Sequence, residues 1–231
     1  MKPRPKDTDW IDIHSHQTDG QEGVFRIFNL FLEDFHEDVS FGVFSCGLHP
    51  WHIQQYGELE NFPRRLEEVI RHEKMVAIGE AGLDKVIPTE MEVQEEVFKR
   101  QVELSESYQL PVIIHCVKAF HILLKIRNEM QAKQPWILHG FNSNPQLAAD
   151  LIEKGIYISG GLRMLRSKAK CREILERISP DFLFAETDDD DEKDISEVYA
   201  ELAECMGMNS SELKEIIYRN YNKIFLKNED S

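Results

Sequence analysis

Several residues whose side chains commonly bind metal ions follow short apolar segments of this sequence. The first two, His14 and His16, are separated by one residue at the end of such a segment. Because alternate residues of an extended chain face the same side, both imidazoles should point to one place. Taken alone, the pair could equally face solvent at a strand end. The pattern recurs along the chain, and the candidate ligands are His14, His16, Glu80, His115, His139 and Asp188.

Imidazole and carboxylate donors in this combination suit divalent ions such as Zn, Mn or Mg. Six ligands exceed the roughly four of a tetrahedral structural zinc site, so we expect two divalent metal ions about 3.5–4 Å apart. Such ions make water acidic enough to act as a nucleophile near neutral pH. We expect Glu80 to bridge the ions, and Asp188 both to contact a metal and to accept the proton of the attacking water.

The apolar segments are typical of buried parallel strands, which are covered on both faces. Five of them end in a candidate ligand, and three further segments lie between these five. Because the carboxyl ends of parallel barrel strands open on one face, the fold would gather the ligands at one mouth. Strands are expected at residues 10–14, 24–32, 41–48, 75–80, 111–115, 136–139, 155–159 and 182–188.

Helical spacing of apolar residues separates most of these strands. It predicts helices at residues 62–72, 92–108, 119–130, 145–154, 172–178, 195–206 and 210–221. Eight alternating strands and helices predict one α/β domain over residues 1–231, a TIM-type (β/α) barrel. Residues 16–24 and 33–40 are too short for outer helices, so we expect a distorted barrel with its first two outer helices missing or reduced. A small open sheet over that quarter is the alternative.

Composition limits the partners of the chain. Its 231 residues carry a formal net charge of −15, whereas proteins that bind long nucleic acids usually have a basic surface. No segment approaches the roughly 18 consecutive apolar residues of a membrane span, and residues 1–9 lack the apolar stretch of a signal peptide. The 4 cysteines are scattered, which favours free thiols. We therefore expect a cytoplasmic protein, a monomer without membrane contact.

The motifs around the candidate ligands occur together in one order. They are D-x-H-x-H at 12–16, G-x-H-P at 47–50, A-I-G-E-x-G-L-D at 77–84, P-V-x-I-H at 111–115, L-H at 138–139, E-T-D at 186–188 and N-x-x-x-x-F at 220–225. In these motifs the sequence resembles the TatD family of metal-dependent, deoxyribonuclease-like hydrolases of the amidohydrolase superfamily. The resemblance covers residues 12–225. It implies a barrel, a divalent metal site on the same ligands, and phosphodiester hydrolysis that is often exonucleolytic.

The sequence departs from the family pattern around the substrate. Trp51 stands where the family often has a second histidine directly after His-Pro, and His52 follows it. Lys118 comes shortly after His115, close to where an arginine is common. Residues 189–191 are aspartates in place of the usual proline, and 139–143 read H-G-F-N-S in place of H-C-F-S-G. The motifs that carry the metal ligands are therefore intact, while the residues expected to surround the substrate differ from the family pattern. These differences put cleavage of DNA in question, but not metal-dependent hydrolysis.

Four residues are candidate substrate contacts, each with a structural alternative. His49 could reach a substrate phosphate or pack against Trp51, and Lys118 could bind an anion as a point charge or simply be exposed. Arg163 and Lys168 belong to a basic run after the seventh strand, which predicts either a phosphate-binding loop or a solvated face.

Three functions compete on this evidence. The leading one is a phosphodiesterase or nuclease for small phosphodiesters or short single-stranded nucleic acid, without stable binding of long duplex DNA. A second is a metal-dependent amide or ester hydrolase of the same superfamily. The third is a catalytically silent metal-binding relative.

Overall fold

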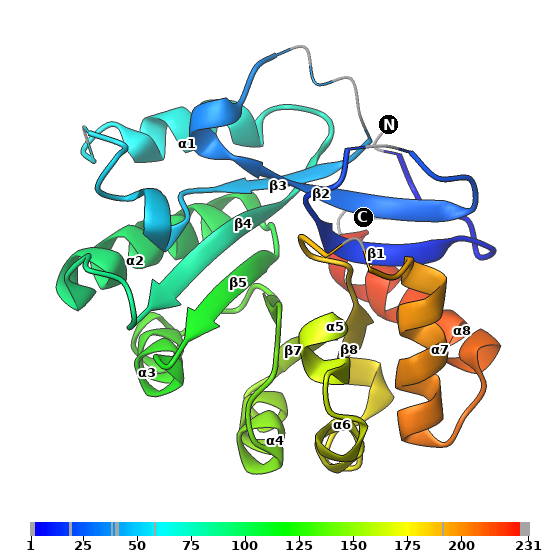
Figure 1. Ribbon diagram of the computed structural model, residues 1–231. Coiled ribbons are helices and arrows are strands. Elements are labelled where there is room, and N and C mark those ends of the chain that lie inside the picture. Colours follow the sequence, from blue (N-terminus) through cyan, green and yellow to red (C-terminus); the bar gives the residue numbers. More distant parts are fainter. Residues whose placement is uncertain are drawn as a thin grey trace. The chain divides into compact units, whose positions relative to one another are not determined.

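The computed structural model describes residues 3–18, 20–37, 39, 42–57, 59–190 and 192–226. Figure 1 shows its helices and strands in sequence colours. In chain order they are β1 (Trp10–Ser15), β2 (Val24–Phe31), η1 (Leu32–Asp34), β3 (Phe44–Gly47), η2 (Pro50–His52), α1 (Phe62–Ile70), β4 (Met75–Asp84), α2 (Met91–Tyr108), β5 (Val112–Val117), α3 (Phe120–Met130), β6 (Trp136–Leu138), α4 (Pro145–Glu153), β7 (Ile156–Gly160), α5 (Leu162–Leu165), α6 (Lys168–Leu175), η3 (Pro180–Phe182), β8 (Leu183–Ala185), α7 (Ile195–Met206) and α8 (Ser210–Phe225).

The strands are hydrogen-bonded in the order β1 to β8. The pairings β1–β2, β3–β4, β4–β5 and β7–β8 are parallel. The end of β1 also meets the segment after β8, because Ser15 and Asp188 form a parallel bridge and the Asp188 N–H donates to the His14 carbonyl at 3.0 Å. This is the strand order of a TIM-type barrel, and the predicted α/β class is confirmed.

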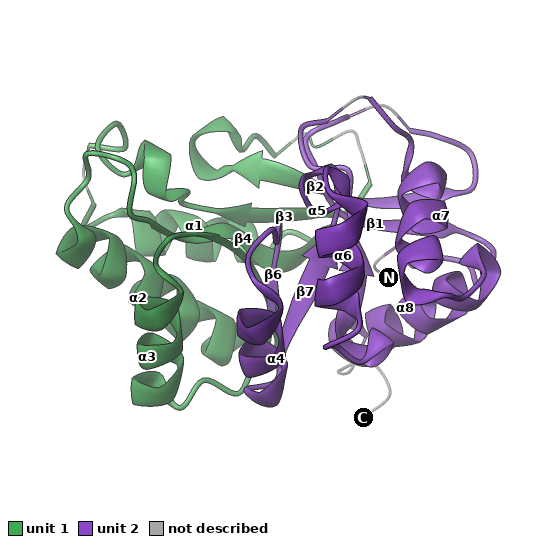
Figure 2. Ribbon diagram, turned by 60° about the horizontal axis from the view of Figure 1, so that its bottom comes forward, with its two compact units in different colours: residues 1–2, 29–136 green, residues 3–28, 137–231 purple. Residues whose placement is uncertain are grey.

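The described residues fall into two compact units, coloured separately in Figure 2. Unit 1 contains residues 29–136, and unit 2 contains residues 3–28 and 137–226. Each unit has its own buried apolar side chains, among them Phe44, Phe62 and Phe98 in unit 1 and Ile11, Tyr199 and Phe184 in unit 2. The single domain expected over residues 1–231 stays a prediction.

In unit 1 a close approach of two strands explains part of the A-I-G-E-x-G-L-D motif. Gly82 lies on β4, which is buried along its whole length and pairs with β5. The backbone at Gly82 has φ +154°, and a Cβ there would lie 1.9 Å from the His115 carbonyl oxygen. A side chain cannot be placed at this position without moving β5, so glycine is required where β4 passes the strand that carries His115.

In unit 2 the closing N-x-x-x-x-F motif has a structural role. The Asn220 side chain on α8 donates to the carbonyl oxygens of Pro180 and Leu183, each at 2.9 Å. Phe225 packs edge-on against Phe184 of β8, with ring centroids 6.1 Å apart. The motif therefore attaches α8 to the strand that leads to Asp188.

The first outer helices are reduced, as predicted. Among the described residues there is no helix between β1 and β2, and the described part of the segment between β2 and β3 holds only the three-residue 3-10 helix η1. The strand expected at 41–48 begins at Phe44, and Phe41 lies outside the described residues. Strand β4 runs to Asp84, four residues beyond the end that the position of Glu80 suggested.

The phosphate-binding loop, one of the two alternatives for the basic run after the seventh strand, is not formed at residues 162–165 and 168–175, which are the helices α5 and α6. Helix α6 begins at Lys168 rather than at 172, since the Ser167 side chain caps it by accepting from the Lys170 N–H. Buried Cys171 and Ile174 anchor its inner face. Within the described part of the chain, no helix has the length and apolar character of a membrane span.

Candidate metal centre

The carboxyl ends of β1 and β8 bring three predicted ligands of unit 2 together. Asp188 Oδ1 lies 3.5 Å from His14 Nε2 and 3.7 Å from His16 Nε2. Backbone hydrogen bonds fix the arrangement, since the His16 N–H donates to the Asp188 carbonyl at 2.9 Å. Asp188 itself has φ +57°, a left-handed conformation that Asp tolerates and that turns the chain after β8. One donor atom of each residue converges on a space that could hold a metal ion.

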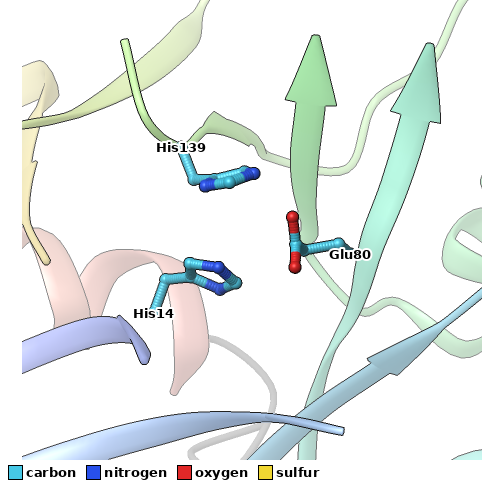
Figure 3. Close-up of side chains that lie close together, drawn as sticks. All are labelled: His14, Glu80 and His139. Atoms are coloured by element: carbon cyan, nitrogen blue, oxygen red, sulfur yellow. The ribbon is translucent and has the colours of Figure 1, made fainter. Parts of the chain in front are cut away.

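His139 completes the imidazoles of unit 2. Its ring centroid lies 4.3 Å from that of His14, and Figure 3 shows the two rings together. Glu186 positions the loop after His139, because its Oε1 accepts from the Gly140 N–H at 2.6 Å. Burial raises the pKa of Glu186, although His139 and His14 act in the opposite direction. His139, Glu186 and Asp188 also bring their donor atoms together.

A buried network of polar groups joins the D-x-H-x-H and E-T-D motifs. Asp12 accepts from the Thr187 N–H at 3.1 Å and from the Thr187 hydroxyl at 2.7 Å, and it receives Arg26 Nε at 3.1 Å. The Thr187 hydroxyl also lies 3.0 Å from the Ser15 hydroxyl. The two segments that carry His14, His16 and Asp188 are thus held together by side chains as well as by backbone.

Unit 1 holds a second cluster of donors, made by His49, Glu80 and His115. Glu80 extends from β4 and is also drawn in Figure 3. Its Oε2 lies 3.5 Å from His49 Nε2 and 3.7 Å from His115 Nδ1. All three residues are buried. His49, predicted only as a substrate contact, therefore lies directly beside the candidate metal ligand Glu80.

The two histidines of this cluster present different ring nitrogens for different reasons. His115 Nε2 lies 3.1 Å from Asp84 Oδ2, so a proton on Nε2 leaves the lone pair of Nδ1 facing Glu80. His49 Nδ1 accepts from the Trp51 N–H at 3.2 Å, which places the proton of the neutral ring on Nε2. His115 is thus prepared to bind a metal, whereas His49 is prepared to donate a hydrogen bond.

Asp84 is held as a carboxylate beside His115. Burial acts to raise its pKa, but hydrogen bonds from His115, Trp51 and the Val86 N–H outweigh burial and hold the pKa at about 2. The Gln94 side chain fixes the Asp84 backbone from α2, accepting from its N–H at 2.7 Å and donating to its carbonyl at 3.0 Å. In metal sites, a carboxylate commonly orients a ligating histidine by accepting from the ring nitrogen that does not bind the metal.

Divalent ions fit the chemistry of both clusters. Imidazole nitrogens and carboxylate oxygens are the donors that Zn and Mn accept, and carboxylates suit Mg. His14, His16 and Asp188 offer one set in unit 2, and Glu80 with His115 offers another in unit 1. The predicted ligands thus fall into two groups, and within each group the donor atoms lie close together.

The predicted substrate contacts are placed less uniformly. Arg163 Nε lies 3.6 Å from Asp188 Oδ2, so this cation lies beside the unit 2 cluster. Lys168 Nζ instead lies 2.7 Å from Glu204 Oε2, in an exposed ion pair between α6 and α7. Lys118 is exposed at the end of β5, where its backbone has φ +54°. Only Arg163 of these three cations has a contact with a candidate ligand among the interactions found in the described residues.

A family model described as TatD related DNase matches residues 25–226. The chain belongs to the TatD family. It is similar to the uncharacterized metal-dependent hydrolase YabD of Bacillus subtilis, with 32% identity over 66% of this chain and 60% of YabD. YcfH of Escherichia coli, described in the same words, has 33% identity over 63% of this chain and 55% of YcfH. The match therefore spans less than two thirds of either relative.

Two other relatives of this TatD chain carry different information. The human 3′-5′ RNA nuclease TATDN2 is 32% identical over 69% of this chain and 21% of its own length. The crystal structure of the E. coli TatD homologue YjjV matches with a TM-score of 0.79 and 23% identity, covering 96% of this chain and 99% of YjjV. The likeness to YjjV shows the fold, which agrees with the TIM-type strand order.

Several residues that contact the candidate ligands or their neighbours were not found by reading the sequence. Asn29 Nδ2 donates to Glu80 Oε1 at 3.0 Å, and Asn29 Oδ1 accepts from the Glu80 N–H at 2.8 Å. Gln101 of α2 accepts from the Leu48 N–H and donates to its carbonyl, next to His49. A signal existed for each: Asn29 interrupts an apolar strand, and Gln101 is seven residues from Gln94 on the buried side of α2.

Replacing Asn29 with alanine is expected to weaken metal binding or hydrolysis by at least about 10-fold, as removal of outer-shell partners of metal ligands does. The substitution removes both hydrogen bonds that orient the Glu80 carboxylate and backbone. Metal affinity measured by calorimetry, together with initial rates, checks the prediction. Asn128→Ala, an exposed change on α3, is the matched control. Unchanged metal affinity and rate in the Asn29 variant would contradict a positioning role.

Proposed function

We propose that this TatD protein is a divalent-metal-dependent phosphodiesterase that acts on small phosphodiesters or short single-stranded nucleic acid. The observation that carries the proposal is the His115–Asp84 pair, in which Asp84 contacts Nε2 of the ring while Nδ1 lies 3.7 Å from Glu80 Oε2. Metal-ligating histidines almost always donate their second ring N–H to a carboxylate, a backbone carbonyl or a water, as His115 can do to Asp84. The human relative described as a 3′-5′ RNA nuclease supports the choice of a phosphodiester.

In this proposal two divalent ions would be held by His14, His16, Glu80, His115, His139 and Asp188. When bound, the ions would supply Lewis acidity toward a phosphoryl oxygen and toward water. Asp188 would accept a proton at a carboxylate oxygen. His49 would donate from Nε2 to the substrate, and Arg163 would offset the charge of a phosphate near Asp188.

The net charge of −15 limits how large the substrate can be. It repels a polyanion over the Debye length of about 8 Å at physiological ionic strength. Bound ions and Arg163 would reverse the sign only locally, across a few phosphates. We therefore propose weak binding of long duplex DNA. The expected monomeric state and cytoplasmic location stay predictions.

The test is hydrolysis by protein stripped with a chelator and then supplied with Mn, Mg or Zn. We expect bis-p-nitrophenyl phosphate to be cleaved only with metal, and p-nitrophenyl acetate to be cleaved far more slowly. Elemental analysis should find up to two ions per chain, fewer in His16→Ala and Glu80→Ala. His121→Ala, an exposed change on α3, is the matched control. Faster metal-dependent cleavage of the acetate would favour an ester or amide hydrolase, and equal metal content in all variants would refute the ligand set.

A substrate-length series at 50 and 200 mM salt tests the substrate class. We expect short single strands to be preferred, with a weak dependence of KM on salt. A nuclease that makes 6–10 phosphate contacts would instead lose about 10³–10⁵-fold in affinity over this range. Preference for long duplex DNA together with a steep loss at 200 mM salt would contradict the proposal.

A further inference from the structure

Trp51 is unusual among the large apolar side chains of the described residues. With 55% of its surface exposed, it is one of two such side chains that are strongly exposed, the other being Val86. An isolated exposed apolar residue needs no explanation by itself. The position of Trp51 nevertheless calls for an explanation, because Trp51 follows His49 by two residues and contacts residues of the unit 1 cluster.

Three contacts hold the Trp51 indole in place. Its Nε1–H donates to Asp84 Oδ2 at 2.7 Å, and the same oxygen lies 3.1 Å from His115 Nε2. Its ring meets those of His49 and His115 edge-on, with centroids 5.1 and 5.8 Å away. The edge that carries the N–H is thus bonded inward to a buried carboxylate, while more than half of the side chain faces solvent.

An indole held in this way is a preformed surface for another flat ring. Its orientation is already fixed by Asp84, so little side-chain freedom is lost when a ligand stacks on it. Stacking on an aromatic side chain is how proteins bind single strands without reading their sequence, because every base has a π-face. It also needs no positive charge, which suits a chain with a net charge of −15.

We propose that Trp51 is a stacking platform for the base of the nucleotide whose phosphate lies at the unit 1 cluster. The proposal deepens the phosphodiesterase function proposed above and rests on it. It assigns the substrate to phosphodiesters that carry a base, namely nucleotides and short single strands. A bare sugar phosphodiester would be cleaved but held less tightly.

The competing role for Trp51 is purely structural, through its hydrogen bond to Asp84. Variants separate the two roles, because Trp51→Phe keeps an aromatic ring but removes the N–H. Trp51→His keeps a ring N–H but offers a smaller stacking surface, and Trp51→Ala keeps neither. Val86→Ala is the matched control, since it removes an exposed apolar side chain but leaves the backbone N–H that donates to Asp84.

The experiment compares a single-stranded tetranucleotide with the same strand made abasic at each position in turn, using metal-loaded protein. For Trp51→Ala we expect KM for the tetranucleotide to rise about 5- to 30-fold, the lower part of the range for one stacked base. We expect kcat to change less than about twofold, and KM for the strand that lacks the stacked base to stay unchanged. Trp51→Phe should lose only part of this affinity, because it keeps a six-membered ring for stacking but not the hydrogen bond to Asp84, and Trp51→His should fall between Phe and Ala.

A binding measurement gives a readout that does not depend on turnover. Adding a nucleoside 5′-monophosphate to metal-loaded protein should quench tryptophan fluorescence, and the quenching should be lost in Trp51→Phe even though calorimetry still detects binding. Equal losses of kcat on every strand in Trp51→Phe and Trp51→Ala would overturn the platform in favour of the structural role. Unchanged KM in Trp51→Ala would overturn it as well. If wild-type protein cleaves none of the strands, the phosphodiesterase function fails first, which is a distinct outcome.

Discussion

Asp188→Asn is expected to lower phosphodiester hydrolysis by about 10²–10⁴-fold, the usual contribution of a positioned general base. An amide oxygen cannot take the proton that the proposed role requires. The fold should survive, because Asn tolerates the left-handed backbone at φ +57° as well as Asp does. The backbone hydrogen bonds between this residue and the His14 and His16 main chain do not involve the side chain.

The measurement is kcat of the variant and of wild type at equal metal occupancy, established by elemental analysis. Asp189→Asn is the matched control, since it removes a carboxylate from the neighbouring, exposed position. Loss of metal from the Asp188 variant would assign the residue mainly to metal binding. Near-normal turnover with full metal content would show that another group accepts the proton.

The grouping of candidate ligands within each unit is what a simple rule of parallel sheets leads one to expect. His14, His115 and His139 each follow an apolar run, and strand ends in such a fold lie on the same face. The alternating spacing of His14 and His16 was informative for the same reason. These inferences depend on local pattern and strand direction, both of which are written in the sequence.

The distinction between His49 and His115 was not predictable from the sequence. Each is a histidine at the end of a strand, yet one accepts a hydrogen bond at Nδ1 and the other contacts a carboxylate at Nε2. The partner that distinguishes His115 is Asp84 at the end of β4, 31 residues away in the sequence, and only the folded chain brings the two side chains together. The role of Asn29 escaped for the same reason, since its partner Glu80 is 51 residues away.

The basic run after the seventh strand shows a second limit. Arg163 and Lys168 look alike in sequence, five residues apart in the same charged segment. Once that segment is helical, Arg163 lies beside Asp188 while Lys168 pairs with Glu204 on α7. Which member of a charged run reaches a site depends on helix phase and on neighbouring acidic residues, and neither can be read from the charged run itself.

Asp12→Ala is expected to destabilise the protein by about 3–5 kcal/mol, the cost of breaking a buried ion pair by removing one partner. Asp12 is fully buried and Arg26 is 8% exposed, so the substitution leaves a guanidinium charge in the interior. Burial raises the pKa of Asp12, while Thr187 and Arg26 act to lower it, which agrees with a carboxylate that depends on these partners. The Thr187 N–H would also lose its acceptor.

Urea denaturation followed by circular dichroism gives the free energy of unfolding, with Asp181→Ala as an exposed control. The double variant Asp12→Ala with Arg26→Met should recover part of the loss, because it also removes the buried guanidinium charge that Asp12 no longer offsets. A loss below about 1 kcal/mol, or a double variant no more stable than the single one, would contradict the role given to this pair. The effect should extend to function, since Asp12 holds Thr187 next to Ser15 and Asp188 directly follows Thr187. In conditions where the Asp12 variant is still folded, we therefore expect it to bind metal more weakly than wild type, although Asp12 is not among the proposed ligands.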